Sequence, residues 1–201
     1  MNKFLFKVSF IILFLFLGTA KTFAQKLKFL IPDAGIVQHA GSIGYFSVGA
    51  GYEIFKNKKG YLDFNYGYVP AFKGGELHAV TVKLAYKPFE IKLSDWAKLY
   101  PFNPGFFLSY TFQEDLAYKF HSSEYPRGYY YWSPALRPHL SFSNEIELSI
   151  PESWDGLGIN KIGLYTEFNT NDFYIVNYLQ NTSSLSLSDI FQLGIGVRLK
   201  F

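Results

Sequence analysis

Four residues in the second half of the chain have types and spacing that could support nucleophilic chemistry. They are His139, Ser141, Ser143 and Glu145, which alternate with other residues and would share one face of a β-strand. A histidine and a serine two residues apart on such a face can approach hydrogen-bond distance, and a carboxylate can orient the imidazole. The pattern makes these residues candidates for a hydrolase site, although it favours a polar strand face without catalysis.

The stretch Arg137–Glu145 resembles the His-x-Ser-Asn segment of outer-membrane lipid A 3-O-deacylases, which are also small barrels. The resemblance implies hydrolysis of a lipid acyl chain. This sequence departs from the family because Ser141 is followed by Phe142, and Ser143-Asn144 comes two residues late. We therefore expect a protein without enzymatic activity and keep a lipid A-modifying hydrolase as the alternative.

A second candidate site is an aromatic run with neighbouring arginines. Tyr129, Tyr130, Tyr131 and Trp132 are consecutive and follow Arg127 closely. Such rings can stack on sugars, and arginine can pair with phosphates, so the segment is a candidate binding patch. The alternative is an aromatic girdle with a structured loop, because tyrosine and tryptophan favour membrane interfaces.

Composition narrows the class of protein. The 201 residues include no cysteine, 20% are aromatic, only 17% are charged, and the formal net charge is +3. The weak, interleaved charge argues against a nucleic-acid partner, and the lack of cysteine excludes thiol chemistry. His78 and His121 have no second ligand at a suitable spacing, so we predict no metal and no cofactor.

The first 24 residues have the order of a secretory signal. Lys3 and Lys7 precede the apolar run Val8–Gly18, and small residues lead to Ala24. We predict cleavage near Ala24 and a single mature domain over residues 25–201. The apolar run is shorter than the roughly 20 residues of a membrane-spanning helix, so a membrane location would require a β-barrel.

The end of the chain shows the clearest strand pattern. From Phe191 to Phe201 apolar residues alternate with polar residues or glycine, as a lipid-facing barrel strand requires. The same alternation recurs, and we predict an all-β fold: a transmembrane antiparallel barrel, with eight strands and a polar, filled lumen. The other seven predicted strands are Ser42–Phe55, Tyr61–Val69, Ala79–Lys87, Gly105–Gln113, Arg137–Ile150, Lys161–Phe168 and Asp172–Leu179.

The predicted connections leave one conflict. Lys92–Pro104, Lys119–Pro134 and Pro151–Asn160 are expected to be the long loops. If Ser42 began the first strand and both termini were periplasmic, Lys119–Pro134 would lie on the periplasmic side, where turns are normally short. Residues 25–41 are left as either an extra strand or an N-terminal plug.

The inward faces of the predicted strands carry charges of both signs. We predict a lumen charge network without a conducting pore, with Tyr45 and Tyr61 helping to fill it and Lys200 reaching water. Arg198 is expected to pair with one of the inward acids. The predicted inward charged residues are Glu53, Asp63, Lys83, Arg137, Glu145, Glu147, Glu167 and Arg198, with His139 beside them.

The signal sequence, the short alternating strands and the terminal Phe201 together resemble the broad superfamily of small outer-membrane barrels of Gram-negative envelopes. The resemblance implies location in the cell outer membrane, contact with its lipid, and insertion by the barrel-assembly machinery, for which Phe201 would be the signal. We expect a monomer with a structural or surface-interaction role. A narrow transporter of a small apolar molecule is a further alternative.

Overall fold

The computed structural model describes residues 30–112, 135–151 and 158–201. Contacts divide the chain into two units, Met1–Pro32 and Asp33–Phe201, and the second unit contains the fold described below. Among the described residues it has nine strands. They are β1 (Ala34–Ala40), β2 (Phe46–Ile54), β3 (Gly60–Val69), β4 (Leu77–Tyr86), β5 (Ile91–Lys92), β6 (Ala97–Phe112), β7 (Leu136–Ser149), β8 (Lys161–Asn171) and β9 (Gln192–Lys200).

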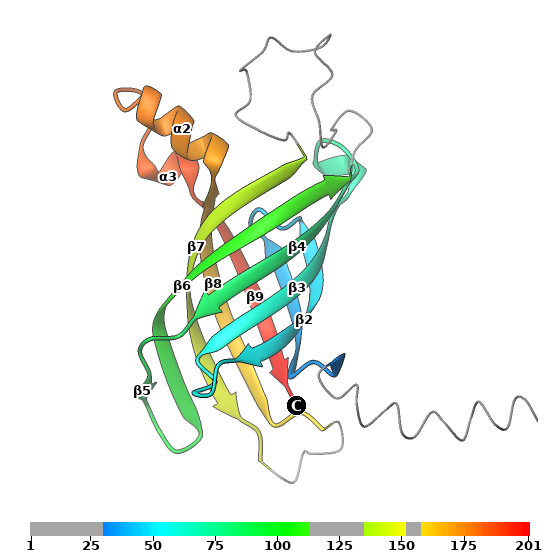
Figure 1. The fold of residues 1–201 in the computed structure, drawn as a ribbon, viewed down its shortest axis with the longest axis vertical. Helices are drawn as coiled ribbons and strands as arrows, with labels where there is room; N and C mark the ends of the chain where they lie inside the picture. Colours follow the sequence, from blue (N-terminus) through cyan, green and yellow to red (C-terminus); the bar gives the residue numbers. More distant parts are fainter. Residues whose placement is uncertain (1–29, 113–134, 152–157) are drawn as a thin grey trace, which may run out of the picture. The chain divides into compact units, whose positions relative to one another are not determined.

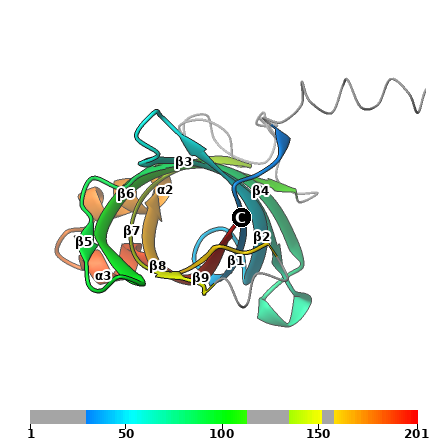
Figure 2. The same ribbon diagram turned by 90° about the horizontal axis from the view of Figure 1, so that it is seen from below.

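Eight of these strands close into an antiparallel barrel (Figures 1 and 2). The order is β4-β3-β2-β1-β9-β8-β7-β6, and pairing of β4 with β6 completes the ring. The two-residue β5 pairs only with the first part of β6. The predicted eight-stranded antiparallel barrel is therefore confirmed.

The two-residue alternation of the sequence determines which side chains point into the barrel. On the outer wall, apolar side chains are exposed along every long strand, whereas their polar neighbours in sequence are buried in the lumen. We call this outer surface the apolar belt. It includes Val48, Phe64, Val82, Leu84, Phe106, Leu108, Leu140, Ile146, Leu164, Leu193 and Ile195.

The two ends of the barrel differ. β1 begins and β9 ends at the same end, which we call the terminal end; the label C marks it in Figure 1. At the opposite end, which we call the far end, β8 and β9 are joined through the helices α2 (Asp172–Gln180) and α3 (Leu187–Ile190), and β3 and β4 through the short helix η2 (Ala71–Lys73). Within the described residues, no helix is long and apolar enough to cross a bilayer.

One predicted strand is wrong. Asp172–Leu179 forms α2, a helix that begins where β8 ends. Its start is fixed by Asn171, whose side-chain oxygen accepts a hydrogen bond from the backbone N–H of Tyr174 at 2.9 Å. The aromatic and β-branched residues of this segment favour a strand by propensity, and the cap and the tertiary context override that preference.

The eighth strand of the barrel is instead β1, which lies within the segment left as an extra strand or a plug. β1 pairs with β2 on one side and β9 on the other. With β1 as the first strand, β6 ends and β7 begins at the far end, opposite the termini. The conflict over the side of Lys119–Pro134 therefore came from starting the count at Ser42; that segment itself lies outside the described residues.

Part of the predicted loop Lys92–Pro104 is also wrong, because β6 already begins at Ala97. Pro104 is opposite Phe142 of β7, and Pro101 lies in a bulge between Tyr100 and Asn103. Neither proline pairs with β4, because that pairing stops at Gly105. Proline lacks a backbone donor and is tolerated where one neighbour is missing. The two prolines made this segment look like a loop in the sequence, although β6 continues through both of them.

Candidate functional site

The candidate site is the lumen, whose half next to the terminal end is filled by ion pairs. We call this the charged half. Its buried members are Asp63, Lys83, Lys87, Glu145, Glu147, Glu167, Arg198 and Lys200.

Arg198 of β9 is at the centre of the charged half. Its guanidinium donates two hydrogen bonds to the carboxylate of Asp63 on β3, at 2.9 and 2.7 Å, and its Nε lies 3.8 Å from Glu145 on β7. Asp63 is completely buried. A two-point arginine–carboxylate pair of this kind is both directional and strong. It connects strands that are not neighbours in the sheet, so it crosses the lumen.

Two lysines, one on the inner face of β4 and one just past its end, form further bridges. Lys83 donates to Glu167 of β8 at 2.6 Å. Lys87, just past the end of β4, lies 2.7 Å from Glu145. Its ammonium group also lies between two rings, 4.3 Å from the centroid of Tyr61 and 4.4 Å from that of Tyr100.

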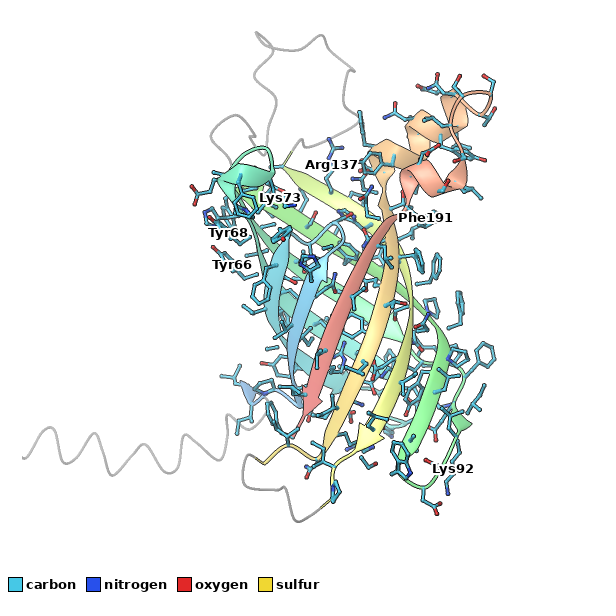
Figure 3. The ribbon with its side chains drawn as sticks, turned by 180° about the vertical axis from the view of Figure 1, so that it is seen from behind. Tyr66, Tyr68, Lys73, Lys92, Arg137 and Phe191 are labelled. Carbon is cyan, nitrogen blue, oxygen red and sulfur yellow. The ribbon has the colours of Figure 1, made fainter. Side chains whose placement is uncertain are left out.

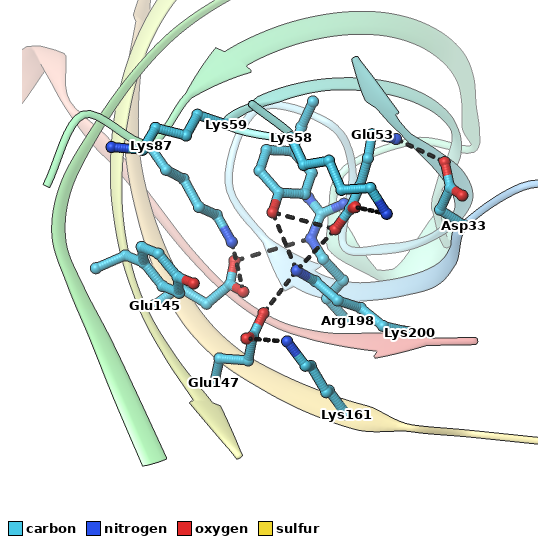
Figure 4. A network of polar contacts seen from close by, with 12 residues as sticks. Asp33, Glu53, Lys58, Lys59, Lys87, Glu145, Glu147, Lys161, Arg198 and Lys200 are labelled. Carbon is cyan, nitrogen blue, oxygen red and sulfur yellow. Dashed lines mark hydrogen bonds and ion pairs between the residues drawn. The ribbon is translucent and has the colours of Figure 1, made fainter. Parts of the chain in front are cut away.

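Lys200 closes the network at the terminal end (Figure 4). Its ammonium group donates to Glu147 at 2.6 Å, to the hydroxyl of Tyr61 at 3.0 Å and to Glu53 at 3.2 Å. Glu147 also accepts from Lys161 at 2.9 Å. The expectation that Lys200 reaches water is wrong, because three partners from three strands hold it in the lumen, where it is 7% exposed.

The half of the lumen toward the far end has a different content, and we call it the neutral half. Its buried residues include Gln38, Ser47, Asn65, Thr81, Phe107, Ser109, His139 and Asn169. Tyr165 donates to Gln38 at 2.9 Å, and Asn65 donates to Thr81 at 3.3 Å. Ile43, from the turn between β1 and β2, is buried against the inner face of Gly67. Hydrogen bonds and packing fill this half in place of ion pairs.

The candidate catalytic residues do not come together as a triad in the described structure. His139 shares a 2.9 Å hydrogen bond with Ser109 of β6 and stacks on Phe107, with ring centroids 4.2 Å apart. Glu145 faces Lys87 and Arg198 in the charged half. Ser143 accepts from Asn103 at 3.4 Å. All these side chains lie on the lumen face rather than on the belt.

Other predicted site residues are placed as follows. Arg137 lies at the far end, where it pairs with Asp172 at 3.2 Å, and not in the charged half (Figure 3). Glu53 lies at the terminal mouth beside Lys58 and Lys200. Tyr45 is 36% exposed and contributes nothing to the lumen, whereas Tyr61 is buried there. The aromatic patch Tyr129–Trp132 and Arg127 lies outside the described residues.

The described residues line a small cavity inside the barrel and a larger one at its terminal end. A cavity of about 20 Å³ lies among Lys83, Glu145, Tyr165 and Arg198, and it is little larger than one water molecule. A cavity of about 230 Å³ opens at the terminal end among Lys59, Glu90 and Tyr100. Glu90, outside the barrel strands, accepts from Lys98 at 2.7 Å, and this hydrogen bond holds the pKa of its carboxyl below the ordinary value.

Sequence reasoning missed three lumen residues that the structure makes central. Gln38 was missed because β1 was not counted as a strand. Asn103 and Tyr100 were missed because the two prolines of β6 made their segment look like a loop. For Tyr100 and Asn103, the signal that could have found them is the alternation of inward residues that resumes after the prolines.

No family model matches this chain, and no curated protein matches it. Seven chains of solved structures are similar to it. One is the crystal structure of the N-terminal β-barrel domain of Pseudomonas aeruginosa OprF, with 9% identity over 85% of this chain and 98% of that chain, and a TM-score of 0.40. Another comes from the de novo design of transmembrane β-barrels, with 12% identity over 85% of this chain and 97% of that chain, and a TM-score of 0.38.

Proposed function

We propose that this chain is an integral outer-membrane β-barrel whose filled lumen does not conduct, and that it has a structural or surface-interaction role. Any binding would then take place at its ends or on its outer wall rather than through the barrel.

The distribution of side chains supports a membrane location. The apolar belt is exposed all round the wall, whereas ionised residues are buried inside, the reverse of a soluble protein. A closed barrel pairs every wall strand with two neighbours and leaves no open edge among the eight strands. Lipid would cover the belt without leaving backbone groups unpaired.

The absence of a pore is inferred mainly from the ion pair between Arg198 and Asp63. This pair, with Glu145 beside it, crosses the lumen within the charged half, and the bridges made by Lys83 and Lys87 lie close to it. A transport path for an apolar molecule would have to separate these buried charges, which favours the closed barrel over the transporter.

The test is fractionation of cells that express the full chain. We expect the protein in the outer-membrane fraction, with an electrophoretic mobility that changes when the sample is boiled. Recovery as a soluble periplasmic protein would contradict the proposal. A matched comparison of lipid A from cells with and without the protein tests the absence of hydrolysis, since a changed acyl pattern would favour the hydrolase instead.

A further inference from the structure

The segment that joins β8 to β9 is unusually apolar for a connection outside a barrel. We call residues 172–190, with α2 and α3, the helical hairpin. Asp172 and Asp189 are its only charged residues, and it contains no lysine or arginine. Its apolar side chains are Phe173, Tyr174, Ile175, Val176, Tyr178, Leu179, Leu185, Leu187 and Ile190.

Among the described residues, most of these apolar side chains are half-buried or exposed. No residue of α2 is buried, and in α3 only Ile190 is. Leu179 is 68% exposed and Leu187 is 56% exposed. A helix that packs on a protein core normally buries one apolar stripe, whereas α2 contacts β7, β8 and α3 without burying any of its own residues.

The position of the helical hairpin brings it beside the apolar belt. Seen along the barrel axis, α2 and α3 lie outside the ring of strands (Figure 2). Figure 1 shows α3 at about the level of the upper ends of β6 and β7. Phe191, directly after α3, has its ring 5.6 Å from that of Phe142, which in turn stacks on Phe168 at 5.2 Å. The apolar surface therefore continues from the belt to the base of the helical hairpin.

Both carboxylates of the helical hairpin and some of its other polar groups are paired within it or at its base. Asp172 pairs with Arg137 at 3.2 Å. Asp189 accepts from the backbone N–H of Ser186 at 2.8 Å and from its hydroxyl at 2.7 Å, which caps α3. Asn181 donates to the carbonyl of Asn177 at the end of α2. These contacts reduce the cost of placing the two carboxylates close to an apolar environment.

We propose that the helical hairpin is a lipid-contacting element: its exposed leucines and neighbouring apolar side chains lie in the interfacial region of the membrane leaflet at the far end. The partner is the acyl-chain boundary of that leaflet, which matches an apolar surface without basic residues. The inference rests on the proposed membrane location, and it adds a lateral contact beyond the barrel wall.

The chain has no cysteine, so single cysteines can be introduced for spin labelling without a background. The test positions are Leu179→Cys and Leu187→Cys in the full chain, inserted into dioleoylphosphatidylcholine vesicles. Leu164→Cys on the belt serves as the lipid control, and Lys92→Cys near the terminal end, 64% exposed at its side chain, serves as the water control. The heat-dependent gel shift of each variant shows that it has folded.

We expect labels at 179 and 187 to collide with oxygen more than with a water-soluble nickel chelate, giving a ratio near that of position 164 and above that of position 92. A ratio equal to that of position 92 would overturn the inference, and so would low access to both reagents, which would mean that protein covers the hairpin. If position 164 also reports water, the proposed membrane location itself fails, so the two failures are distinguishable.

Discussion

The two halves of the lumen are filled by different kinds of side chain and interaction. In the charged half, Arg198, Lys83 and Lys200 reach across the barrel to carboxylates on strands that are not their neighbours. In the neutral half, Gln38, Phe107 and His139 fill a space of similar width with hydrogen bonds and ring stacking. The charged half therefore depends on matched partners, whereas the neutral half depends on shape.

The charged and neutral residues of the lumen are separated in the same direction on several strands. On β3, Asn65 lies farther from the termini than Asp63, and on β4 Thr81 lies farther than Lys83. On β8, Asn169 lies farther than Glu167. On each of these three strands the inward charge therefore lies nearer the termini than the inward neutral residue. This comparison leads to predictions in which loss of one partner costs more in the charged half than in the neutral half.

The largest effect is expected for Arg198→Ala. The substitution leaves Asp63 buried without its guanidinium, and removing one partner of a buried pair costs about 3–5 kcal/mol of unfolding free energy. Urea unfolding in lipid vesicles measures this change. Lys92→Ala, at an exposed pair with Asp95, is the control and should cost less than about 1 kcal/mol. Equal losses in the two variants would contradict the account.

A smaller but more diagnostic effect is expected at the pair of Lys83 and Glu167. Lys83→Met should lower the unfolding free energy by about 3 kcal/mol, because the buried carboxylate loses its partner. The double variant Lys83→Met/Glu167→Gln should recover part of this loss, since no unpaired charge remains. A double-mutant cycle measures the coupling, and additive effects would show that the pair does not act as a unit.

In the neutral half, Gly67→Ala tests shape rather than charge. A Cβ at this position would lie 1.8 Å from the backbone oxygen of Ile43, so the turn between β1 and β2 must move. We expect a loss of about 2 kcal/mol in urea unfolding, typical of overpacking. Gly35→Ala is the matched control, because its nearest neighbour would be 3.7 Å away. A loss no larger than that of the control would refute the packing role of Ile43.

The smallest effect is expected for Gln38→Leu. This change removes the acceptor of the Tyr165 hydroxyl but leaves no unpaired charge, so we expect a loss of about 1 kcal/mol. The same unfolding measurement applies. A loss as large as that of Arg198→Ala would show that the neutral half is as dependent on pairing as the charged half.

Much of the barrel could be predicted because each strand has one face toward the polar lumen and one apolar outer face. Polar and apolar residues therefore alternate along the sequence of the strand. The pattern at β9 and β3 gave their inward residues, and Asp63 was among the expected partners of Arg198. The pattern failed at β1, where inward Ala34 and Ile36 are apolar and remove the contrast between faces. It also failed at α2, whose residues favour a strand until the cap at Asn171 is known.

The placement of Lys200 could not be predicted for a different reason. A lysine near the end of a strand is usually solvated, and its burial depends on Glu53, Tyr61 and Glu147 meeting at the same level. Those residues come from β2, β3 and β7, so their meeting depends on how the barrel closes. Local sequence specifies the face of each residue, whereas the partner across the lumen depends on register and strand order.

The central claim is that the lumen is closed by its own side chains, and the current through single barrels in a planar bilayer tests it most directly. We predict that the folded full chain produces no stable conductance at moderate voltage. A stable, ohmic conductance of the unmodified protein would contradict the account, because it would require an open aqueous path past Arg198 and Asp63.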